Sequence, residues 1–197
     1  MPYEKGHTLL YYLESQLGGP AVFEPWFRAY IEKFKYKSLN TAQWKSFLFE
    51  FFASQPEKTA ILEKVDWEAW FHGVGMPPVK PAFNTSLLDA CTDLAKKWID
   101  ANDAALPNFT ADEFLKLDSK QRVEFLAQML LAPDEAVTVT KCQKMAELYG
   151  LDQVRNSEIR FRWLRLGLKA KWEAAIPKAI AMVTEQGRMK FTRPLYK

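Results

Sequence analysis

Apolar residues recur every three or four positions through most of this chain, and this period limits the possible folds more than any other feature. Leu9, Leu13 and Leu17 form one such stripe near the start, and Phe47 and Phe51 belong to another. This spacing places the residues on one face of an α-helix, whereas a half-buried strand shows strict alternation. Alternating runs of β-branched residues are nearly absent. The pattern therefore predicts an all-α protein.

Capping residues, glycines and prolines divide these stripes into separate helices. A capping residue followed three positions later by Gln or Glu predicts helix starts at Asn40, Thr110 and Asp118. Gly18-Gly19-Pro20 predicts the end of the first helix, and Pro177 predicts a kink or break in the last one. The expected helices cover about residues 6–16, 21–34, 41–52, 56–65, 66–71, 86–101, 110–117, 118–130, 137–150, 157–170 and 171–186.

The second expected helix is rich in aromatic residues. Its buried face is predicted to consist of Phe23, Phe27, Tyr30, Ile31 and Phe34. The third expected helix carries a further aromatic stripe with Trp44, Phe47 and Phe51, which at helical spacing is typical of a protein core rather than of a ligand groove. We therefore expect these side chains to hold the fold together.

A stretch rich in glycine and proline separates two groups of helices. Residues 73–84 contain Gly73, Gly75, Pro77, Pro78 and Pro81, and proline pushes the residue before it out of the helical region. We place a domain boundary here, with one domain over residues 1–80 and another over 81–197. Short loops between antiparallel helices predict an α-solenoid of HEAT or armadillo type, with an irregular bundle as the alternative.

Composition narrows the classes of partner and compartment. The net charge of +3 is mild, whereas nucleic-acid-binding domains concentrate basic charge on one face. No long uncharged apolar run is present to cross a membrane, and the first residues do not form a secretory signal. Cys91 and Cys142 predict two free, buried thiols in a reducing compartment. We expect a cytoplasmic protein with no nucleic-acid and no membrane partner.

Several longer motifs carry a family resemblance that extends over essentially the whole chain. Pro2-Tyr3-Glu4-Lys5-Gly6 precedes the first apolar helix, and three further motifs begin at Asp66, Gly75 and Asn156. The last motif runs from Glu185 to Tyr196. Together they resemble the gluzincin zinc aminopeptidases, in the branch of leukotriene A4 hydrolase and aminopeptidase B. The resemblance implies that residues 1–80 are the helical end of a thermolysin-like catalytic domain and that residues 81–197 are the C-terminal helical domain.

The zinc motif of that family is missing. The family binds zinc with a His-Glu-x-x-His helix and a downstream Glu, but this chain contains only His7 and His72, and neither lies in such a motif. Neither has a second ligand at the spacing that zinc sites require. The resemblance implies zinc in the complete enzyme, and we expect no cofactor in this chain. The chain alone is therefore expected to be inactive.

Tyr3 is the predicted catalytic residue. In the resembled family the tyrosine of this motif donates a hydrogen bond to the oxygen that becomes negative during peptide hydrolysis, and such a bond strengthens in the transition state. From spacing alone, Tyr3 is better described as a residue at a frayed chain terminus. The resemblance assigns it the catalytic role.

Arg188 and Lys190 are the predicted substrate-binding residues. Gly187 is expected to end a helix, so that the next three residues are extended and Arg188 and Lys190 point the same way. A guanidinium beside an ammonium suits a carboxylate. In the resembled family this pair binds the carboxylate end of the substrate, the peptide C-terminus or a fatty acid. The alternative from residues alone is a solvated basic tail.

Other functions remain possible on the sequence alone. A non-catalytic solenoid would bind a protein or an acidic peptide near Arg188 and Lys190. The basic helix from Arg160 to Lys171 is a weaker candidate for nucleic-acid binding. Glu158 and Arg162, four positions apart, have the spacing of a helical ion pair and are expected to have a structural role. The predicted partners are a peptide with a free C-terminal carboxylate, the missing catalytic half, and a second copy of the chain through self-association.

Overall fold

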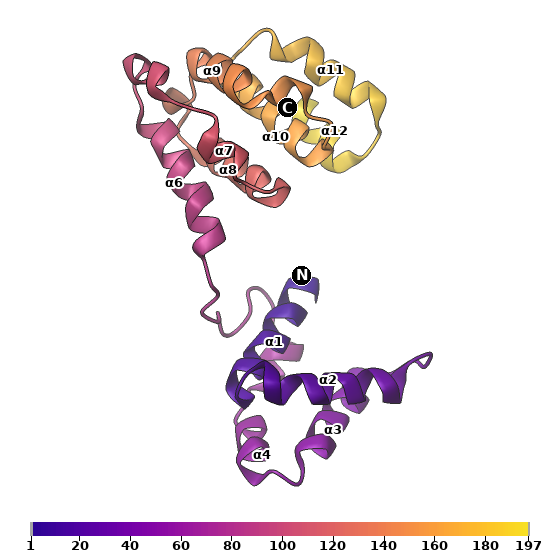
Figure 1. The fold of residues 1–197 in the computed structure, drawn as a ribbon. Coiled ribbons are helices and arrows are strands. Elements are labelled where there is room, and N and C mark those ends of the chain that lie inside the picture. The colour runs from indigo at the N-terminus through magenta and orange to yellow at the C-terminus, as the bar shows by residue number, and fades with distance from the viewer. Residues whose placement is uncertain (1, 197) are drawn as a thin grey trace. The chain divides into compact units, whose positions relative to one another are not determined.

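The computed structural model describes residues 2–196, and within this range the chain is helical with no strand (Figure 1). The prediction of an all-α protein is confirmed. The helices divide into two compact units, of which the first ends at Phe83 and the second begins at Asn84. Within residues 2–196, no helix combines the length and the apolar character needed to cross a bilayer.

The helices of the first unit form a ring of contacts. Helix α1 packs on α2, α2 on α3 and α3 on α4, and α4 returns to α1. The helices are α1 (Pro2–Leu17), α2 (Pro20–Phe34), α3 (Thr41–Phe52), α4 (Pro56–Glu63) and the short α5 (Trp67–Phe71). The ring encloses one aromatic-rich core.

Local sequence signals fix the helix ends in this unit. Gly18 and Gly19 have φ of 110° and 91°, a region that favours glycine, and they end α1 as predicted. The capping box at the start of α3 is confirmed, because the Gln43 N–H donates to Asn40 Oδ1 and the Asn40 N–H donates to Gln43 Oε1, each over 2.9 Å. Asp66 caps α5 by accepting a hydrogen bond from the Ala69 N–H.

The buried face of α2 differs from the predicted one. Trp26 is fully buried, whereas Phe27 is 42% exposed and Ile31 is 46% exposed. Phe23 is buried and Tyr30 half-buried, as predicted. The helix is thus rotated toward Trp26, which contacts the rings of Phe23 and Tyr30. The prediction that Phe27 and Ile31 belong to the core is wrong.

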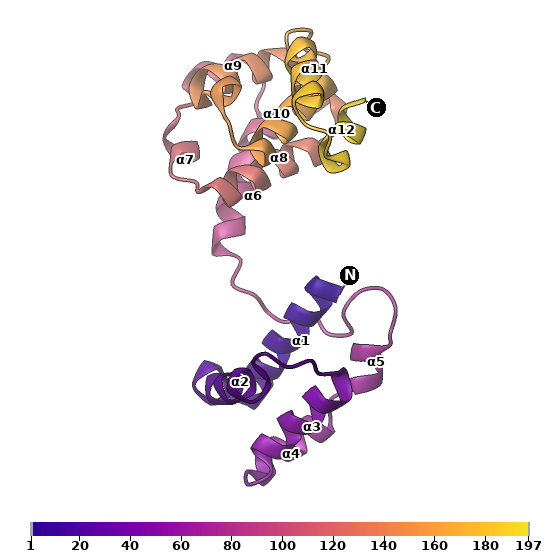
Figure 2. The same ribbon diagram turned by 90° about the vertical axis from the view of Figure 1, so that its right-hand side faces the viewer.

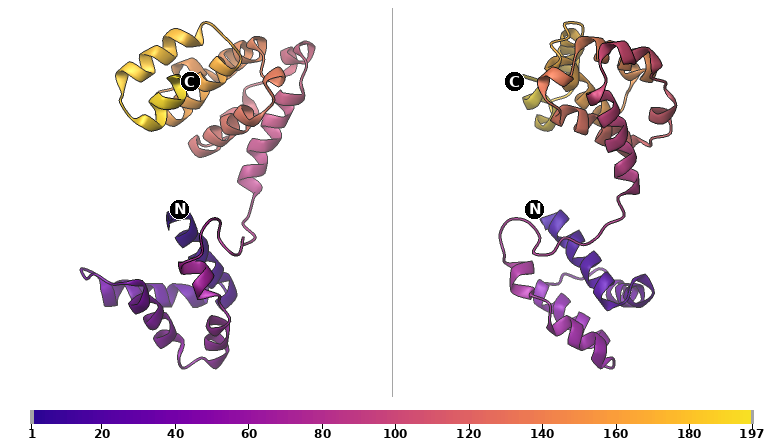
Figure 3. Two further views of the ribbon diagram at one scale, coloured as in Figure 1. Left: turned by 180° about the vertical axis from the view of Figure 1, so that it is seen from behind. Right: turned by 90° about the vertical axis from the view of Figure 1, so that its left-hand side faces the viewer.

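The second unit contains the remaining helices, in two layers. They are α6 (Ser86–Asp100), η1 (Asp103–Asn108), α7 (Asp112–Leu115), α8 (Ser119–Leu131), η2 (Asp134–Ala136), α9 (Val139–Tyr149), η3 (Leu151–Gln153), α10 (Ser157–Lys169), α11 (Ala175–Glu185) and α12 (Met189–Tyr196). Helices α6, α8, α10 and α12 pack in chain order, α9 contacts α10, and α11 contacts α10 and α12 (Figure 2). Views from behind and from the other side show the same order (Figure 3). This is the predicted two-layered solenoid.

Two capping boxes were predicted in this unit, and one of them forms. Asp118 and Gln121 exchange both bonds at the start of α8. The box at Thr110 is wrong, because α7 begins at Asp112 and Ala111 occupies its cap. Thr110 Oγ1 instead donates to the Asp112 carboxylate, which leaves the N-terminal end of α7 without a side-chain cap.

The segment expected to form one helix over residues 171–186 begins with a turn. Lys171 has φ of 57°, and the Trp172 N–H donates to the Gly167 carbonyl over 2.9 Å, a bond typical of the motif that closes helix C-termini. Helix α11 begins only at Ala175. Pro177 therefore lies in its first turn, where the missing N–H removes no helical bond, and the predicted break within a helix does not occur.

Polar groups in the main core of the second unit are paired. Trp98 is fully buried, and its Nε1 donates to Tyr149 Oη over 2.8 Å. Lys141 is 3% exposed, and its Nζ donates to the carbonyls of Ile99 and Ala136 over 3.0 and 2.9 Å. Burial raises the pKa of Tyr149 to about 12. Satisfied buried polar groups of this kind fix one packing arrangement.

Candidate functional site

Tyr3 lies in the first turn of α1 rather than before it. The helix begins at Pro2, four residues earlier than predicted, since proline is well suited to the first helical position. The Tyr3 side chain is 89% exposed. Its phenol makes no hydrogen bond with any of residues 2–196, so it is available to a ligand.

Lys5 ties this first turn to the end of α5. Its Nζ donates to the Ala69 carbonyl over 2.9 Å and to the Gly73 carbonyl over 2.6 Å. A cation suits this position because the last carbonyls of a helix lack intrahelical partners. The sequence gives no local signal for the contact, because Lys5 and Gly73 are 68 positions apart.

Two of the motifs that carry the family resemblance meet in the first unit. A hollow of about 420 Å³ lies between α1 and the loop that follows α5. It is lined by Glu4, Lys5 and Thr8 from α1 and by Gly75, Met76 and Pro77 from that loop. Phe83 closes one side of this hollow and stacks on Tyr11, with ring centroids 4.8 Å apart. The Tyr3 motif and the glycine-proline motif are therefore one structural neighbourhood.

Arg188 and Lys190 lie at the start of α12. The Arg188 carbonyl accepts hydrogen bonds from the N–H groups of Phe191 and Thr192, so Arg188 immediately precedes the helix and Lys190 is in its first turn. The predicted extended conformation is wrong. Both cations contact the same aromatic ring, because Arg188 Cζ and Lys190 Nζ each lie 5.4 Å from the centroid of the Phe191 ring.

Lys190 forms an ion pair with the carboxylate of Glu158. Lys190 Nζ lies 2.5 Å from Glu158 Oε1, and Arg162 Nη1 lies 2.9 Å from Glu158 Oε2. The hydrogen bonds from Lys190 and Arg162 lower the pKa of Glu158. The predicted Glu158–Arg162 ion pair is confirmed, and Lys190 is a third member of the cluster that sequence spacing does not reveal.

Arg188 is in a different state. Its side chain is exposed, and no carboxylate in residues 2–196 forms an ion pair with it. Its guanidinium lies against the ring of Phe191, which is 3% exposed. The two predicted substrate-binding residues are thus unequal, since Lys190 has Glu158 as an ion-pair partner and Arg188 has no carboxylate partner among residues 2–196.

The remaining charges of α10 are also largely paired. Arg160 pairs with Glu185, and Lys169 Nζ lies 3.0 Å from Asp134 Oδ1. Arg165 lies over the ring of Phe161, with its Cζ 5.5 Å from the centroid. These basic side chains therefore already have partners within the chain and are less available to the phosphates of a nucleic acid.

The two histidines have structural surroundings. His7 stacks on Phe83, with ring centroids 5.9 Å apart, and His72 follows the last residue of α5. Within residues 2–196, no three His, Cys, Asp or Glu side chains are grouped so that they would hold a metal ion. The residues present therefore do not fit a zinc site.

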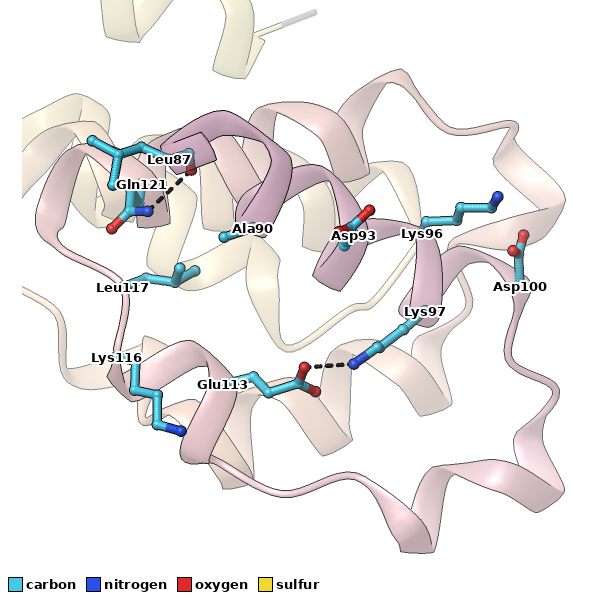
Figure 4. A pocket seen from close by; sticks show the side chains of 10 residues that line it. All are labelled: Leu87, Ala90, Asp93, Lys96, Lys97, Asp100, Glu113, Lys116, Leu117 and Gln121. Atoms are coloured by element: carbon cyan, nitrogen blue, oxygen red, sulfur yellow. Dashed lines mark hydrogen bonds and ion pairs between the residues drawn. The ribbon is translucent and has the colours of Figure 1, made fainter. Parts of the chain in front are cut away.

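A second hollow, of about 930 Å³, lies between α6 and the segment that contains α7 (Figure 4). Lys97 Nζ and Glu113 Oε1 approach to 2.5 Å across it, and Gln121 Nε2 donates to the Leu87 carbonyl over 3.0 Å. The sequence signal for this hollow is the run of charges at 93, 96, 97 and 100 on one side of α6. Its paired charges do not form a nucleophile–base arrangement, so it carries no catalytic assignment.

Comparison with known proteins shows which protein family the C-terminal residues of this chain match. Residues 117–197 match the family described as leukotriene A4 hydrolase, C-terminal. The match covers the C-terminal 81 of the 197 residues. The family recognition made from sequence motifs is thus confirmed.

The leukotriene A4 hydrolase resemblance covers the whole chain. The chain is 50% identical to leukotriene A-4 hydrolase of Xenopus laevis over 197 residues, which are 100% of this chain and 32% of that protein. It is 38% identical over 200 residues to leucine aminopeptidase 2 of Aspergillus clavatus, with 100% and 31% coverage. A solved structure of yeast leukotriene A4 hydrolase in complex with bestatin matches with a TM-score of 0.87 and 33% identity, over 99% of this chain and 33% of that one.

The chain thus corresponds to the C-terminal portion of these hydrolases and spans about a third of their length. The similarity over all 197 residues agrees with the positions of the motifs, which lie at both ends and in the linker. The matched residues include the helices that carry Tyr3 and Arg188. They do not include a His-Glu-x-x-His zinc motif.

Proposed function

We propose that this chain supplies two parts of the active site of a zinc aminopeptidase of the leukotriene A4 hydrolase type. Tyr3 provides the hydrogen bond that stabilises the transition state, and Arg188 with Lys190 binds the carboxylate end of the substrate. The observation that carries the proposal is the similarity over the whole chain, at 50% identity, to a leukotriene A-4 hydrolase. The exposed, unpaired Tyr3 and Arg188 support it.

The geometry of α1 suits a catalytic tyrosine. Attack on a peptide carbonyl places negative charge on its oxygen, and a phenol held in position donates a hydrogen bond that strengthens as the charge grows. Tyr3 is on a helix, and Lys5 anchors the same turn through two hydrogen bonds. A phenol on an anchored turn loses little freedom when it engages the oxygen, which favours rate acceleration.

The start of α12 suits carboxylate binding. Arg188 has a free guanidinium that can form a bidentate pair with a carboxylate. The buried ring of Phe191 supports it from one side. The proposed substrate is accordingly a short peptide with a free C-terminal carboxylate or, in an epoxide-hydrolase reaction, a fatty acid.

Zinc belongs to the complete enzyme in this proposal, outside residues 1–197. A catalytic zinc lowers the pKa of a bound water and polarises a carbonyl. The chain's contribution is restricted to its own groups, namely the Tyr3 phenol, the Arg188 guanidinium and the Lys190 ammonium. We place the complete enzyme in the cytoplasm, a proposal supported by the two free, buried cysteines. Self-association of the separate chain is part of the same proposal, supported by exposed apolar residues such as Phe27 and Ile180.

The decisive experiment is a chimaera in which this chain replaces the matching portion of the Xenopus leukotriene A-4 hydrolase. We expect zinc-dependent aminopeptidase activity. Tyr3→Phe should lower kcat by about 10²- to 10³-fold, the range seen when one oxyanion donor is removed. Arg188→Gln should mainly raise KM for peptides with a free carboxylate. Tyr36→Phe is the matched control, since Tyr36 is fully exposed and carries no assigned role.

A simpler assay uses the chain alone. Hydrolysis of an N-terminal arginine or alanine chromogenic amide is measured with added zinc and with a chelator. We expect no turnover in either condition. Zinc-dependent turnover by the separate chain would contradict the proposal, and so would a Tyr3→Phe chimaera with full kcat.

A further inference from the structure

The carboxylate site proposed above contains a carboxylate of its own. Glu158 lies in the first turn of α10, and its two oxygens are occupied separately, one by Lys190 at 2.5 Å and the other by Arg162 at 2.9 Å. Arg162 also donates to the Glu158 carbonyl over 3.1 Å. Glu158 is therefore held in place from two sides.

Partial burial strengthens this cluster. The side chains of Glu158 and Arg162 are 32% and 22% exposed, so solvent screens their charges less than those of a fully exposed pair. Lys190 is 45% exposed and marks the edge where the cluster meets solvent. A ligand that approaches Lys190 thus meets an ammonium that already has a carboxylate partner, and Glu158 shares its single negative charge between Lys190 and Arg162.

The free cation is close by. Arg188 Cζ and Lys190 Nζ each lie 5.4 Å from the Phe191 centroid, so they are at most about 11 Å apart. Among residues 2–196, Arg188 has no carboxylate partner. A ligand carboxylate should therefore pair with Arg188, while the charge of Glu158 repels any second negative group of the ligand.

We propose that Glu158 is a specificity-determining residue, which pairs with Lys190 and thereby weakens the preference of the Arg188 site for ligands with more than one negative charge. The inference rests on the proposed function, because it refines the substrate class of the same site. Dicarboxylates and phosphate lose more of the attraction of Arg188 and Lys190 than a ligand with one carboxylate does, since the repulsion from Glu158 grows with each charge on the ligand.

Coulomb's law sets the size of the effect. One charge about 10 Å away, in a partly solvated site at low salt, changes the affinity for a monoanion by about two- to threefold. For a dianion the factor is squared, to about four- to ninefold. Selectivity between the two classes of ligand is therefore the informative quantity, rather than affinity alone.

The test is an NMR titration of the full 197-residue chain, labelled with ¹⁵N, at low ionic strength and pH 7.5. N-acetylglycine is the probe with one carboxylate, succinate is the probe with two, and N-acetylglycinamide is the neutral control. The Arg188 Nε–Hε signal reports binding. Glu158→Gln should tighten the binding of both anions, with a larger gain for succinate, and Glu158→Asp should keep the selectivity because it keeps the charge.

Glu113→Gln is the matched control, since Glu113 forms a similar pair with Lys97 elsewhere in the same unit. Weaker binding of N-acetylglycine by Glu158→Gln, or a response equal to that of Glu113→Gln, would overturn the specificity role and leave the proposed function standing. Absence of anion binding in the unmodified chain, or binding that persists in Arg188→Gln, would instead refute the carboxylate site and with it this inference.

Discussion

The cores of the two units differ in whether the N–H group of a buried tryptophan forms a hydrogen bond. In the first unit, Trp26 is fully buried among aromatic rings, and its Nε1 has no hydrogen-bond partner among residues 2–196. In the second unit, the N–H groups of Trp98 and Trp163 donate to Tyr149 and Asp152. A buried polar group without a partner costs free energy, whereas a paired one adds specificity.

The difference indicates how each unit reaches a unique packing. The first unit depends on ring shape and apolar burial around α2, and it tolerates one unsatisfied donor. The second unit adds directional bonds between helices that are far apart in sequence, since Trp98 and Tyr149 are separated by 51 positions. The candidate residues are divided between the two, with Tyr3 in the first unit and Arg188 in the second.

The largest expected effect comes from cavities that are confined to one unit. Leu13 and Leu126 are both fully buried, one in each core. Leu13→Ala and Leu126→Ala should each lower the free energy of unfolding by about 2–5 kcal/mol. Hydrogen exchange measured by mass spectrometry should show faster exchange in the mutated unit only. Equal loss of protection in both units would mean that they unfold as one.

A matched pair of tryptophan substitutions isolates the hydrogen bond. Trp26→Phe and Trp98→Phe remove the same volume from fully buried sites, but only the second leaves the Tyr149 hydroxyl without its donor. We expect Trp98→Phe to destabilise its unit by about 1–3 kcal/mol more than Trp26→Phe destabilises the first. Denaturant unfolding of the variants measures the difference.

The double variant Trp98→Phe/Tyr149→Phe serves as the control for that pair. It removes both polar partners, so part of the lost stability should return. The contrast between the two cores would be refuted if Trp26→Phe were the more costly single change.

A smaller effect is expected at the Lys5 anchor. Lys5→Met keeps the length of the side chain but loses both hydrogen bonds, and it should cost about 1 kcal/mol because the site is only half-buried. Amides of residues 2–8 should exchange faster. Lys35→Met is the matched control, since Lys35 forms only a surface pair with Glu32 and should change stability by less than about 0.5 kcal/mol.

The smallest expected signal is an absence of thiol labelling. Burial raises the pKa of Cys142 to about 12 and also raises the pKa of Cys91, so little thiolate exists at pH 8. Ellman's reagent should react slowly with the native chain. Leu126→Ala should accelerate the labelling and Leu13→Ala should not, because both cysteines lie in the second unit. Rapid labelling of the native chain would contradict the burial.

Helix content and most helix ends followed from the sequence because their causes are local. Asn40, Asp66 and Asp118 cap their helices through neighbours three positions away. The capping box predicted at Thr110 does not form, because the Thr110 hydroxyl donates to the Asp112 carboxylate instead. This competing hydrogen bond is also local in sequence. Family motifs, rather than helical periodicity, identified Tyr3 and Arg188 as candidates.

The failures involve choices that tertiary contacts decide. Five aromatic residues fall within the broad apolar arc of α2, and its period alone does not decide whether Trp26 or Phe27 lies at the centre of the buried face. The short helix at Met189 begins two residues after Gly187, so that an expected extended segment became a helical turn. The Glu158–Lys190 contact joins residues 32 positions apart, which no local spacing rule predicts.

The Lys5 anchor also bears on the order in which the chain folds during synthesis. Lys5 is synthesised before its acceptors, and one of them, Gly73, is added 68 residues later. At about 5–20 residues per second, the first turn of α1 waits about 3–14 s for that partner on the ribosome. Closing so long a loop also slows folding. The turn that carries Tyr3 is therefore completed only after helices α2 to α5 have been synthesised.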